Sequence, residues 1–349
     1  MTSPPVPRVS ILLPCRDAGP HLQECIDSLI AQTETRFEAL VLDDGSTDRT
    51  REILAAWVER DPRARPVEPR GRGIVDALND LAAAARAPIL ARMDADDIAR
   101  PERLAAQLAL LDDRPETAAC GTGVRYFPRE RARSGYRRYE KWLNGLATPE
   151  EIERDLFVEC PIAHPTLVIR RRTLEDIGGY RDIDGPEDYD LVLRLAAAGH
   201  SLANVPEVLL DWRLGEGRLS EGSERYSPEA FRRLKIAHLL EGPLHPERLG
   251  DRELWLWGGG KVGKAFLRSW AAAGQPPFDA IVDLDPRKVG QTIHGAQVVG
   301  PDVLDKRFRG NVDRPFVLGA VGSPGARDDI RCGLEAMGAR ELVDYRMIA

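Results

Sequence analysis

The sequence lacks several features that would place it in particular protein classes. It has no run of about 18 apolar residues, so we expect no membrane-spanning helix. Residues 1–7 hold three prolines and no apolar core, which is not typical of a signal peptide. Its five cysteines are odd in number and show no C-x-x-C spacing, which favours a reducing compartment over a disulfide framework. We therefore expect a cytoplasmic protein, with peripheral contact at the inner face of a membrane left open.

An excess of basic residues is also missing. The formal net charge is -7, and the acidic excess lies in the first 250 residues. This charge distribution argues against a general nucleic-acid-binding protein. A chain of 349 residues with 43% hydrophobic residues is long enough for two domains, each with its own core.

Strand and helix patterns alternate along the first half of the chain. Apolar runs predict buried strands over 9–13, 37–42 and 88–93, and helical spacing predicts helices over 20–32, 47–58, 73–85 and 101–111. This order implies an α/β fold with a mostly parallel sheet and right-handed crossovers. Further on, we expect a strand over 164–169, a helix over 186–198, one or two strands over 201–213 and a flexible segment over 214–226. Residues 125–141 are rich in Arg and Tyr without a clean period, and we interpret them as a solvated insertion rather than a surface for an anionic acceptor or lipid.

Acidic residues follow two of the predicted strands. Ligands of such sheets bind beyond the carboxyl ends of the strands, so the turns at Asp43-Asp44 and at Asp94 to Asp97 should meet in one crevice. Asp94 and Asp96, one residue apart, can share Mg²⁺ or Mn²⁺, although Asp also favours the start of a helix. Asp43 and Asp44 can accept hydrogen bonds from a ribose or a base, or form an ordinary turn.

A third acidic group, Glu187-Asp188, opens a predicted helix. A helix N-terminus stabilises an ionised carboxylate, which suits a general base, although acid-rich helix starts are common. His164 precedes a proline, and we interpret it as a structural residue rather than a catalytic one.

Taken in order, these motifs resemble glycosyltransferase family 2, the inverting enzymes of the GT-A fold. The resemblance covers residues 8 to about 215 and rests on five segments. They are Val9 to Pro14, Val41 to Asp48, Met93 to Asp97, His164 to Tyr180 and Glu187 to Leu191. The loop before the metal motif departs from the family pattern, because Asn79 is followed by Asp80 instead of glycine.

The resemblance implies transfer of a sugar from a nucleotide-diphosphate donor to an acceptor hydroxyl of a glycan, glycolipid or other molecule. It implies a divalent cation, Mn²⁺ or Mg²⁺, at Asp94 and Asp96, and Asp188 as the base with Glu187 beside it. Donor contacts are implied for Pro14, Asp43, Asp44, Gly45, Asp94, Ala95 and Arg213. We expect a GT-A domain over 1–220, a linker or connecting helix over 221–250 and a smaller Rossmann-like domain over 251–349.

The last hundred residues contain a glycine motif. Gly258, Gly260 and Gly263 follow an apolar stretch and precede a helical pattern, and Asp283 lies about twenty residues further on, as in a dinucleotide-binding fingerprint. Residues 290–300 resemble the small nucleotide-binding domains that precede some sugar acyltransferases. Binding of a dinucleotide or nucleotide, regulation and oligomerisation all remain open for this domain.

Three other functions compete with sugar transfer. Nucleotidyltransferases of similar architecture have a Gly-rich, Arg-containing loop after the first strand, and the segment from Pro14 to Gly19 does not resemble it. A non-catalytic nucleotide-sugar-binding scaffold would have a degraded base motif, yet Glu187 and Asp188 are both present. A bifunctional enzyme would use NAD or a nucleotide-sugar in its C-terminal domain.

Overall fold

The computed structural model describes residues 6–215, 223–310 and 313–349, which form two compact units. Within these residues the first unit comprises 6–152, 161–183 and 187–215, and the second comprises 153–160, 184–186 and the remainder. The predicted domain boundaries stay predictions. Parts of two predictions, those for 1–7 and 214–226, lie outside the described residues.

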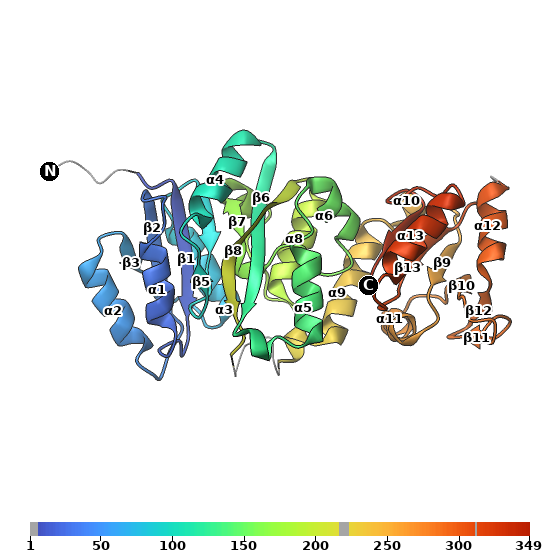
Figure 1. Cartoon of the computed structure of the whole chain (residues 1–349), viewed down its shortest axis with the longest axis horizontal. Helices are drawn as coiled ribbons and strands as arrows, with labels where there is room; N and C mark the ends of the chain where they lie inside the picture. Colours follow the sequence, from blue (N-terminus) through green and yellow to red (C-terminus); the bar gives the residue numbers. More distant parts are fainter. Residues whose placement is uncertain (1–5, 216–222, 311–312) are drawn as a thin grey trace. The chain divides into compact units, whose positions relative to one another are not determined.

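The first unit is built on an eight-stranded sheet in the order β3-β2-β1-β4-β7-β6-β8-β5 (Figure 1). Its strands are β1 (Val9–Cys15), β2 (Phe37–Asp43), β3 (Ala64–Pro66), β4 (Ile89–Arg92), β5 (Ile98–Ala99), β6 (Thr117–Phe127), β7 (Val168–Arg170) and β8 (Ser201–Arg213). The strands from β3 to β4 pair in parallel, as do β6 and β8, whereas β7 and β5 are antiparallel to their neighbours. The predicted α/β class with a mostly parallel sheet is confirmed.

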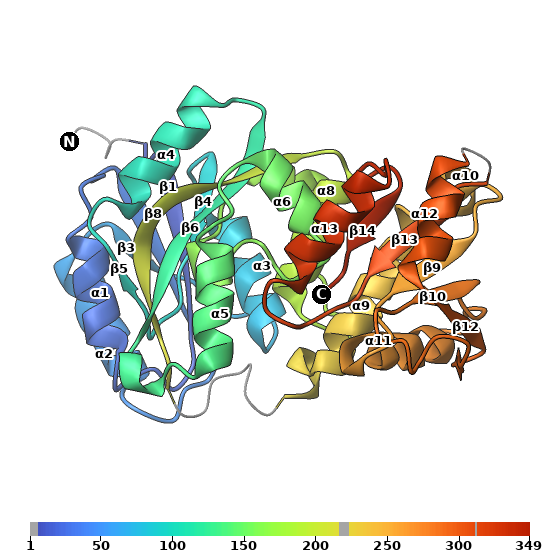
Figure 2. The same cartoon turned by 45° about the vertical axis from the view of Figure 1, so that its right-hand side comes forward.

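Alternation along the buried strands gives the sheet two apolar faces. One core contains Ile11 and Leu13 of β1 together with the apolar sides of α1, α2, α4 and α5. The intervening residues of β1 face the other side, and α3 packs on β1 and β2. Figure 2 shows these helices from a second direction. The helices are α1 (Leu22–Ile30), α2 (Thr50–Arg60), α3 (Ile74–Ala84), α4 (Arg103–Asp113), α5 (Ser134–Leu143), α6 (Pro149–Asp155), α7 (Arg171–Asp176) and α8 (Glu187–Ala197).

Two regions differ from the sequence prediction. The strand expected over 164–169 is only β7, because His164–Thr166 form a 3₁₀ turn around a proline that has no N–H to donate to a sheet. Residues 125–141, predicted to be a solvated insertion, are mostly exposed but regular: they complete β6 and form most of α5. The ring of Tyr126 stacks on Trp212 of β8 with centroids 5.1 Å apart, and Arg129 pairs with Glu140.

The second unit has a six-stranded sheet in the order β11-β12-β10-β9-β13-β14, parallel except for the β11–β12 pair. The first strand of the unit, β9, therefore lies inside the sheet with β10 on one side and β13 on the other. Its strands are β9 (Leu254–Trp257), β10 (Ala280–Val282), β11 (Thr292–Ile293), β12 (Ala296–Val299), β13 (Phe316–Gly319) and β14 (Tyr345–Met347). Its helices are α9 (Pro228–Glu241), α10 (Pro246–Leu249), α11 (Lys261–Ala272), α12 (Pro301–Arg309) and α13 (Ala326–Ala336).

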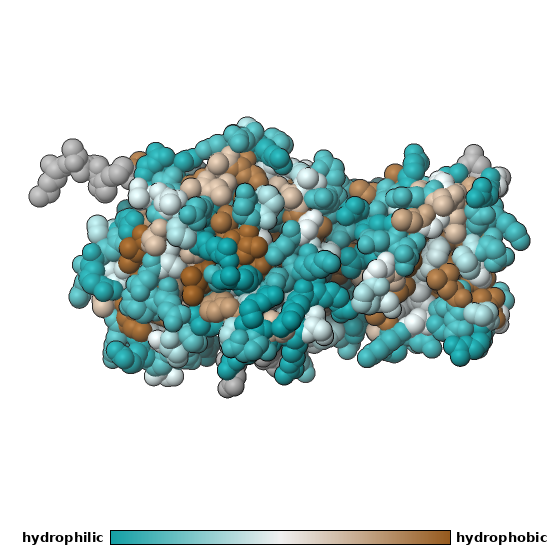
Figure 3. Space-filling view, viewed as in Figure 1, coloured by the Kyte–Doolittle hydropathy of each residue, from teal (hydrophilic) through white to brown (hydrophobic). Residues whose placement is uncertain are grey.

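Hydrophilic residues cover most of the face shown in Figure 3, with hydrophobic residues visible between them. Among the residues that the structure describes, no helix combines the length and the apolar character needed to cross a membrane.

Candidate functional site

The two acidic turns of the first unit meet at one edge of its sheet. Strands β2, β1 and β4 lie side by side in parallel, and the Asp44 N–H donates to the Cys15 carbonyl over 2.8 Å. The buried Cys15 thiol reports the charges around it: burial raises its pKa, and the negative charges of Asp43 and Asp94 raise it further. Both turns thus lie around the end of β1, as the sequence predicts. Pro14 is the penultimate residue of β1, and Gly45 follows the end of β2 with a φ of +76°.

Asp94, Asp96 and Asp97 form a carboxylate cluster directly after β4. One ligand oxygen from each lies within 4.8 Å of the others, and Asp97 is buried while the other two are partly exposed. Ala95 is buried between them. Mg²⁺ and Mn²⁺ prefer such oxygen donors, and a few carboxylates completed by substrate phosphates are a common way to hold them. The residues present therefore fit a divalent cation.

Arg213, at the end of β8, lies against this cluster. Its backbone N–H donates to Asp97 Oδ1 over 2.7 Å, and its Nε donates to the Asp96 carbonyl over 2.6 Å. The guanidinium also pairs with Glu24 of α1 and lies over the Phe127 ring. These contacts fix a positive charge beside the carboxylates, so an anionic ligand there would meet both the arginine and a cation.

Two buried arginines behind the cluster were not predicted from the sequence. Arg92 of β4 is buried and forms an ion pair with Asp94. Burial lowers the pKa of Arg92, but the charge and hydrogen bond of Asp94, together with Tyr180 and Asp97, outweigh burial and raise it. Arg103 of α4 donates to the Arg92 carbonyl over 2.7 Å, and burial together with the charge of Arg92 lowers its pKa to about 10. The signal was available, since Arg92 is a charged residue at the end of an otherwise apolar strand.

Asp43 and Asp44 are held by neighbouring residues at the end of β2. Asp43 accepts from the Ser46 N–H over 3.0 Å and from the guanidinium of Arg51 over 3.0 and 3.1 Å. Burial raises the pKa of Asp43, yet these hydrogen bonds outweigh it and keep the pKa below its ordinary value. Asp44 accepts from the Gly73 N–H over 3.0 Å, which ties the loop before α3 to the end of β2.

Tyr180 interacts both with Arg92, just before the turn at Asp94 to Asp97, and with the start of α8. Sequence analysis assigned it no role beyond marking the end of the segment from His164 to Tyr180. Burial and the charges of Glu187 and Asp188 raise the pKa of its hydroxyl, while the charge of Arg92 opposes them. The hydroxyl lies 3.1 Å from His164 Nε2, and Asn79 of α3 clamps the Tyr180 backbone through its N–H and carbonyl. Burial lowers the pKa of His164 and keeps the ring neutral, which suits a structural hydrogen bond.

Glu187 and Asp188 occupy the first turn of α8, as predicted. Glu187 is 2% exposed, and Asp188 accepts from the Tyr189 N–H over 2.7 Å. Besides burial, the charges of Glu187 and Asp188 raise the pKa of Tyr180, and the charge of Arg92, the ion-pair partner of Asp94, lowers it. The predicted base motif and the Arg92–Asp94 pair therefore both act on the same tyrosine.

The predicted glycine motif of the second unit lies between β9 and α11. Gly258 has a φ of +122°, and a Cβ at Gly263 would lie 1.7 Å from the Gly258 carbonyl oxygen. Asp283 follows β10 and accepts from the Gly259 N–H over 3.0 Å and from Lys288 Nζ over 2.8 Å. Burial raises the pKa of Asp283, but these hydrogen bonds lower it below its ordinary value.

Comparison with known proteins shows that the chain is similar to glycosyltransferases. The family model described as "Glycosyl transferase family 2" matches residues 10–178. An uncharacterized glycosyltransferase of Haemophilus influenzae is 30% identical over 200 residues, which are 57% of this chain and 72% of that protein. The amylovoran biosynthesis glycosyltransferase AmsE of Erwinia amylovora is 28% identical over 214 residues, 61% of this chain and 78% of that protein.

Solved structures show the same fold. TarS 1-349 of S. aureus, in complex with UDP-GlcNAc, superposes with a TM-score of 0.56 at 14% identity, over 76% of this chain and 80% of that one. The mannosyltransferase PcManGT of Pyrobaculum calidifontis, in complex with GDP-Man and Mn²⁺, has a TM-score of 0.51 at 22% identity. The superposition covers 78% of this chain and 77% of that one. These likenesses confirm the predicted GT-A architecture. The start of α8 and Arg213 lie beyond the residues that the family model matches.

Proposed function

We propose the reaction of this chain from one premise: it belongs to glycosyl transferase family 2 and is a glycosyltransferase. The reaction transfers a sugar from a nucleotide-diphosphate donor to an acceptor hydroxyl, with inversion at the anomeric carbon, in polysaccharide or glycoconjugate synthesis. Two similar proteins support this proposal. AmsE is named for amylovoran biosynthesis, and TarS was solved with UDP-GlcNAc.

The observation that carries the proposal is the carboxylate cluster at the end of β4, with Arg213 against it. Asp94 and Asp96 would hold Mn²⁺ or Mg²⁺, with buried Asp97 behind them. When bound, the cation would offset the negative charge of the departing diphosphate. The PcManGT structure was solved with GDP-Man and Mn²⁺, which supports a divalent cation in this fold.

The other residues bind and orient the substrates. Asp43 and Asp44 would accept hydrogen bonds from the ribose or base of the donor, since carboxylate oxygens retain lone pairs beyond those already engaged. Pro14, Gly45 and Ala95 shape the backbone around the donor, and Arg213 would bind its diphosphate.

Asp188 would take the acceptor's proton as the hydroxyl oxygen attacks the anomeric carbon from the face opposite the diphosphate. Glu187 lies beside it. Alignment of donor and acceptor in one crevice supplies much of the rate, because it removes the entropic cost of bringing them together. No covalent intermediate on the protein is required, since a single displacement inverts the configuration.

The test is a panel of nucleotide-sugars with candidate acceptors, assayed for nucleotide-diphosphate release with Mn²⁺, with Mg²⁺ and with EDTA. We expect release to depend on the cation and Asp96→Asn to raise the cation concentration needed. NMR of the product should show an anomeric configuration opposite to that of the donor. Retention of configuration would contradict the single displacement, and full activity in EDTA would contradict the role of the cation.

The base assignment needs its own comparison. Asp188→Asn should lower kcat by about 10²–10⁴-fold with a true acceptor, the usual contribution of a positioned general base. Asp176→Asn is the matched control, because Asp176 is an exposed carboxylate on α7 that pairs with the surface residue Arg172. Equal activity of Asp188→Asn and the control would remove Asp188 from the mechanism.

A further inference from the structure

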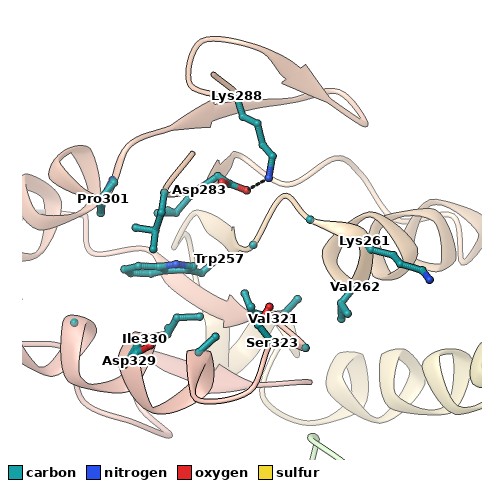
Figure 4. A pocket seen from close by; sticks show the side chains of 18 of the residues that line it. Trp257, Lys261, Val262, Asp283, Lys288, Pro301, Val321, Ser323, Asp329 and Ile330 are labelled. Carbon is teal, nitrogen blue, oxygen red and sulfur yellow. Dashed lines mark hydrogen bonds and ion pairs between the residues drawn. The ribbon is translucent and has the colours of Figure 1, made fainter. Parts of the chain in front are cut away.

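The second unit contains a cavity that the transferase reaction does not use. Its volume is about 580 Å³, within the range of small-molecule sites. It opens at the carboxyl ends of β9, β10 and β13 and is lined by residues such as Trp257, Asp283 and Val321 (Figure 4). Because β10 and β13 leave β9 on opposite sides, this is the point where the strand order reverses, the place where open α/β sheets bind ligands.

The three motif glycines of the loop at the cavity differ in what surrounds them. A Cβ at Gly258 would lie 2.7 Å from the Ala320 carbonyl oxygen, and one at Gly263 would collide with Gly258, so these two glycines serve packing inside the protein. Gly260 differs, because a Cβ there would meet no heavy atom within 4 Å. Nothing in the packing of the described residues demands a glycine at this cavity-lining position. A bound group that approaches the backbone closely would demand it.

The electrostatics at the loop favour an anion. Helix α11 begins directly after Gly260 and has no acidic residue in its first turn, so its free N–H groups and positive dipole end are not offset locally. Asp283 would repel an anion if it were unpaired, but its carboxylate is neutralised by Lys288 at 2.8 Å, the ion pair drawn in Figure 4. The same carboxylate holds the Gly259 N–H, which fixes the loop in place.

Apart from Lys261, Ser323 and Asp329, the remainder of the cavity is lined by apolar residues and glycine and suits a flat ring. Figure 4 shows the Trp257 ring between Pro301 and Asp283 on one side and Ile330 on the other. Leu284 lines the same cavity and is 70% exposed, a large apolar side chain left open to solvent next to Asp283. A ligand that covers Leu284 would remove this apolar surface from water.

We propose that this cavity binds a single nucleotide, with a phosphate against Gly260 and the start of α11 and its base in the apolar part beside Leu284. The β9–α11–β10 unit matches the first βαβ unit of a mononucleotide-binding half of a doubly wound fold, and the strand order β12-β10-β9-β13 matches its sheet, although β11 and a turn replace the crossover helix before β12. A ligand with one base and one phosphate group is the smallest that uses the glycine loop, the Asp283–Lys288 pair and the apolar part together. The site is separate from the donor crevice of the first unit.

Titration calorimetry on the full chain tests this proposal. The probes are ADP, UDP, GDP, CDP and NAD, each in EDTA to suppress cation-dependent binding at the donor crevice. We expect at least one nucleoside diphosphate to bind, and Gly260→Ala to weaken that binding at least tenfold because the methyl group would occupy the place of the phosphate. Gly135→Ala in α5 is the matched control, since a Cβ there also meets no heavy atom within 4 Å.

Hydrogen exchange locates the binding. The bound nucleotide should protect residues 258–264 and 320–330. Binding of NAD alone, binding that Gly260→Ala leaves unchanged, or no binding of any probe would each overturn the proposal. Gly260→Ala should leave sugar transfer in Mn²⁺ at the wild-type rate, so the transferase function and this site can fail independently.

Discussion

The glycine loop of the second unit offers a stability experiment whose outcome the structure determines. Gly263→Ala would place a methyl group 1.7 Å from the Gly258 carbonyl oxygen. Non-bonded carbon atoms ordinarily stay about 3.5–4.0 Å apart, so this approach is far too close. The obstructing atom belongs to the backbone, and Gly258 itself is fixed at a φ of +122° against Ala320. Neither residue can give way cheaply, so α11 must shift away from β9.

Two opposing contributions set the size of the effect. Alanine favours a helix over glycine by about 1 kcal/mol. Overpacking of a tight contact costs about 1–3 kcal/mol, and more where backbone must move. Because the overlap here is severe, we expect Gly263→Ala to destabilise the second unit by about 2 kcal/mol net. At Gly260, an alanine side chain meets no neighbour. The loss of a favoured helix-start residue offsets the lower conformational entropy of the unfolded chain, so the free energy of unfolding should change by less than about 0.5 kcal/mol.

The assay is urea unfolding of the full chain, followed by hydrogen exchange in peptides that cover β9 and α11. This readout reports the second unit separately, which matters because a two-unit chain need not unfold in one step. Gly263→Ala should lower the urea midpoint of these peptides while Gly260→Ala leaves it in place. If both variants unfolded at the same urea concentration, the packing role assigned to Gly263 would be incorrect.

Three further outcomes follow from polar contacts of buried or partly buried side chains. Tyr180→Phe should destabilise the first unit by about 1–3 kcal/mol in urea unfolding, because it leaves the buried His164 ring without its partner at 3.1 Å; an unchanged midpoint would contradict this. Asp155→Asn should cost the second unit about 1.5–3 kcal/mol, since Asp155 is 2% exposed and pairs with Arg331 and Arg327 while Glu341 still neutralises Arg331; a loss below about 1 kcal/mol would show that the pair is replaceable. Asp43 has a lowered pKa in the folded chain, so its stabilising contribution is complete above the ordinary pKa of an aspartate and disappears as the pH falls through the lowered value. Asp43→Asn should flatten that acid limb of the stability curve, and an identical limb in both proteins would refute the assignment.

The sequence was sufficient for the parts of the fold that rest on local patterns. Strands β1, β2 and β4 are short, largely apolar runs and were placed within two residues of their observed bounds. Because parallel strands carry their carboxyl ends to the same edge, the meeting of Asp43 and Asp94 around the end of β1 could also be predicted. The helices between them follow from the 3.6-residue period.

Strand β6 shows where such patterns fail. Its sequence contains two glycines and several small residues and has neither alternation nor an apolar run. The glycines are required by residues distant in the sequence, which leave no room for a side chain. A Cβ at Gly121 would lie 2.4 Å from Asn204 Oδ1, and one at Gly123 would lie 3.0 Å from the Glu207 carbonyl oxygen. Pairing with β8 therefore determines this strand, and residues about eighty positions apart carry the information.

In the candidate sites, too, the sequence predicts where a residue lies but not which residue it pairs with. Spacing alone located Asp94 and Asp283, but it did not reveal that Arg92 neutralises the first and Lys288 the second. In both sites an acid next to an expected phosphate carries a basic partner, which lowers the electrostatic cost of bringing an anion near a carboxylate. Whether an acidic turn can accept a phosphate therefore depends on the residue paired with it. For Asp94 that residue is Arg92, two positions earlier at the end of β4, where a single arginine at the end of an apolar run was the available clue.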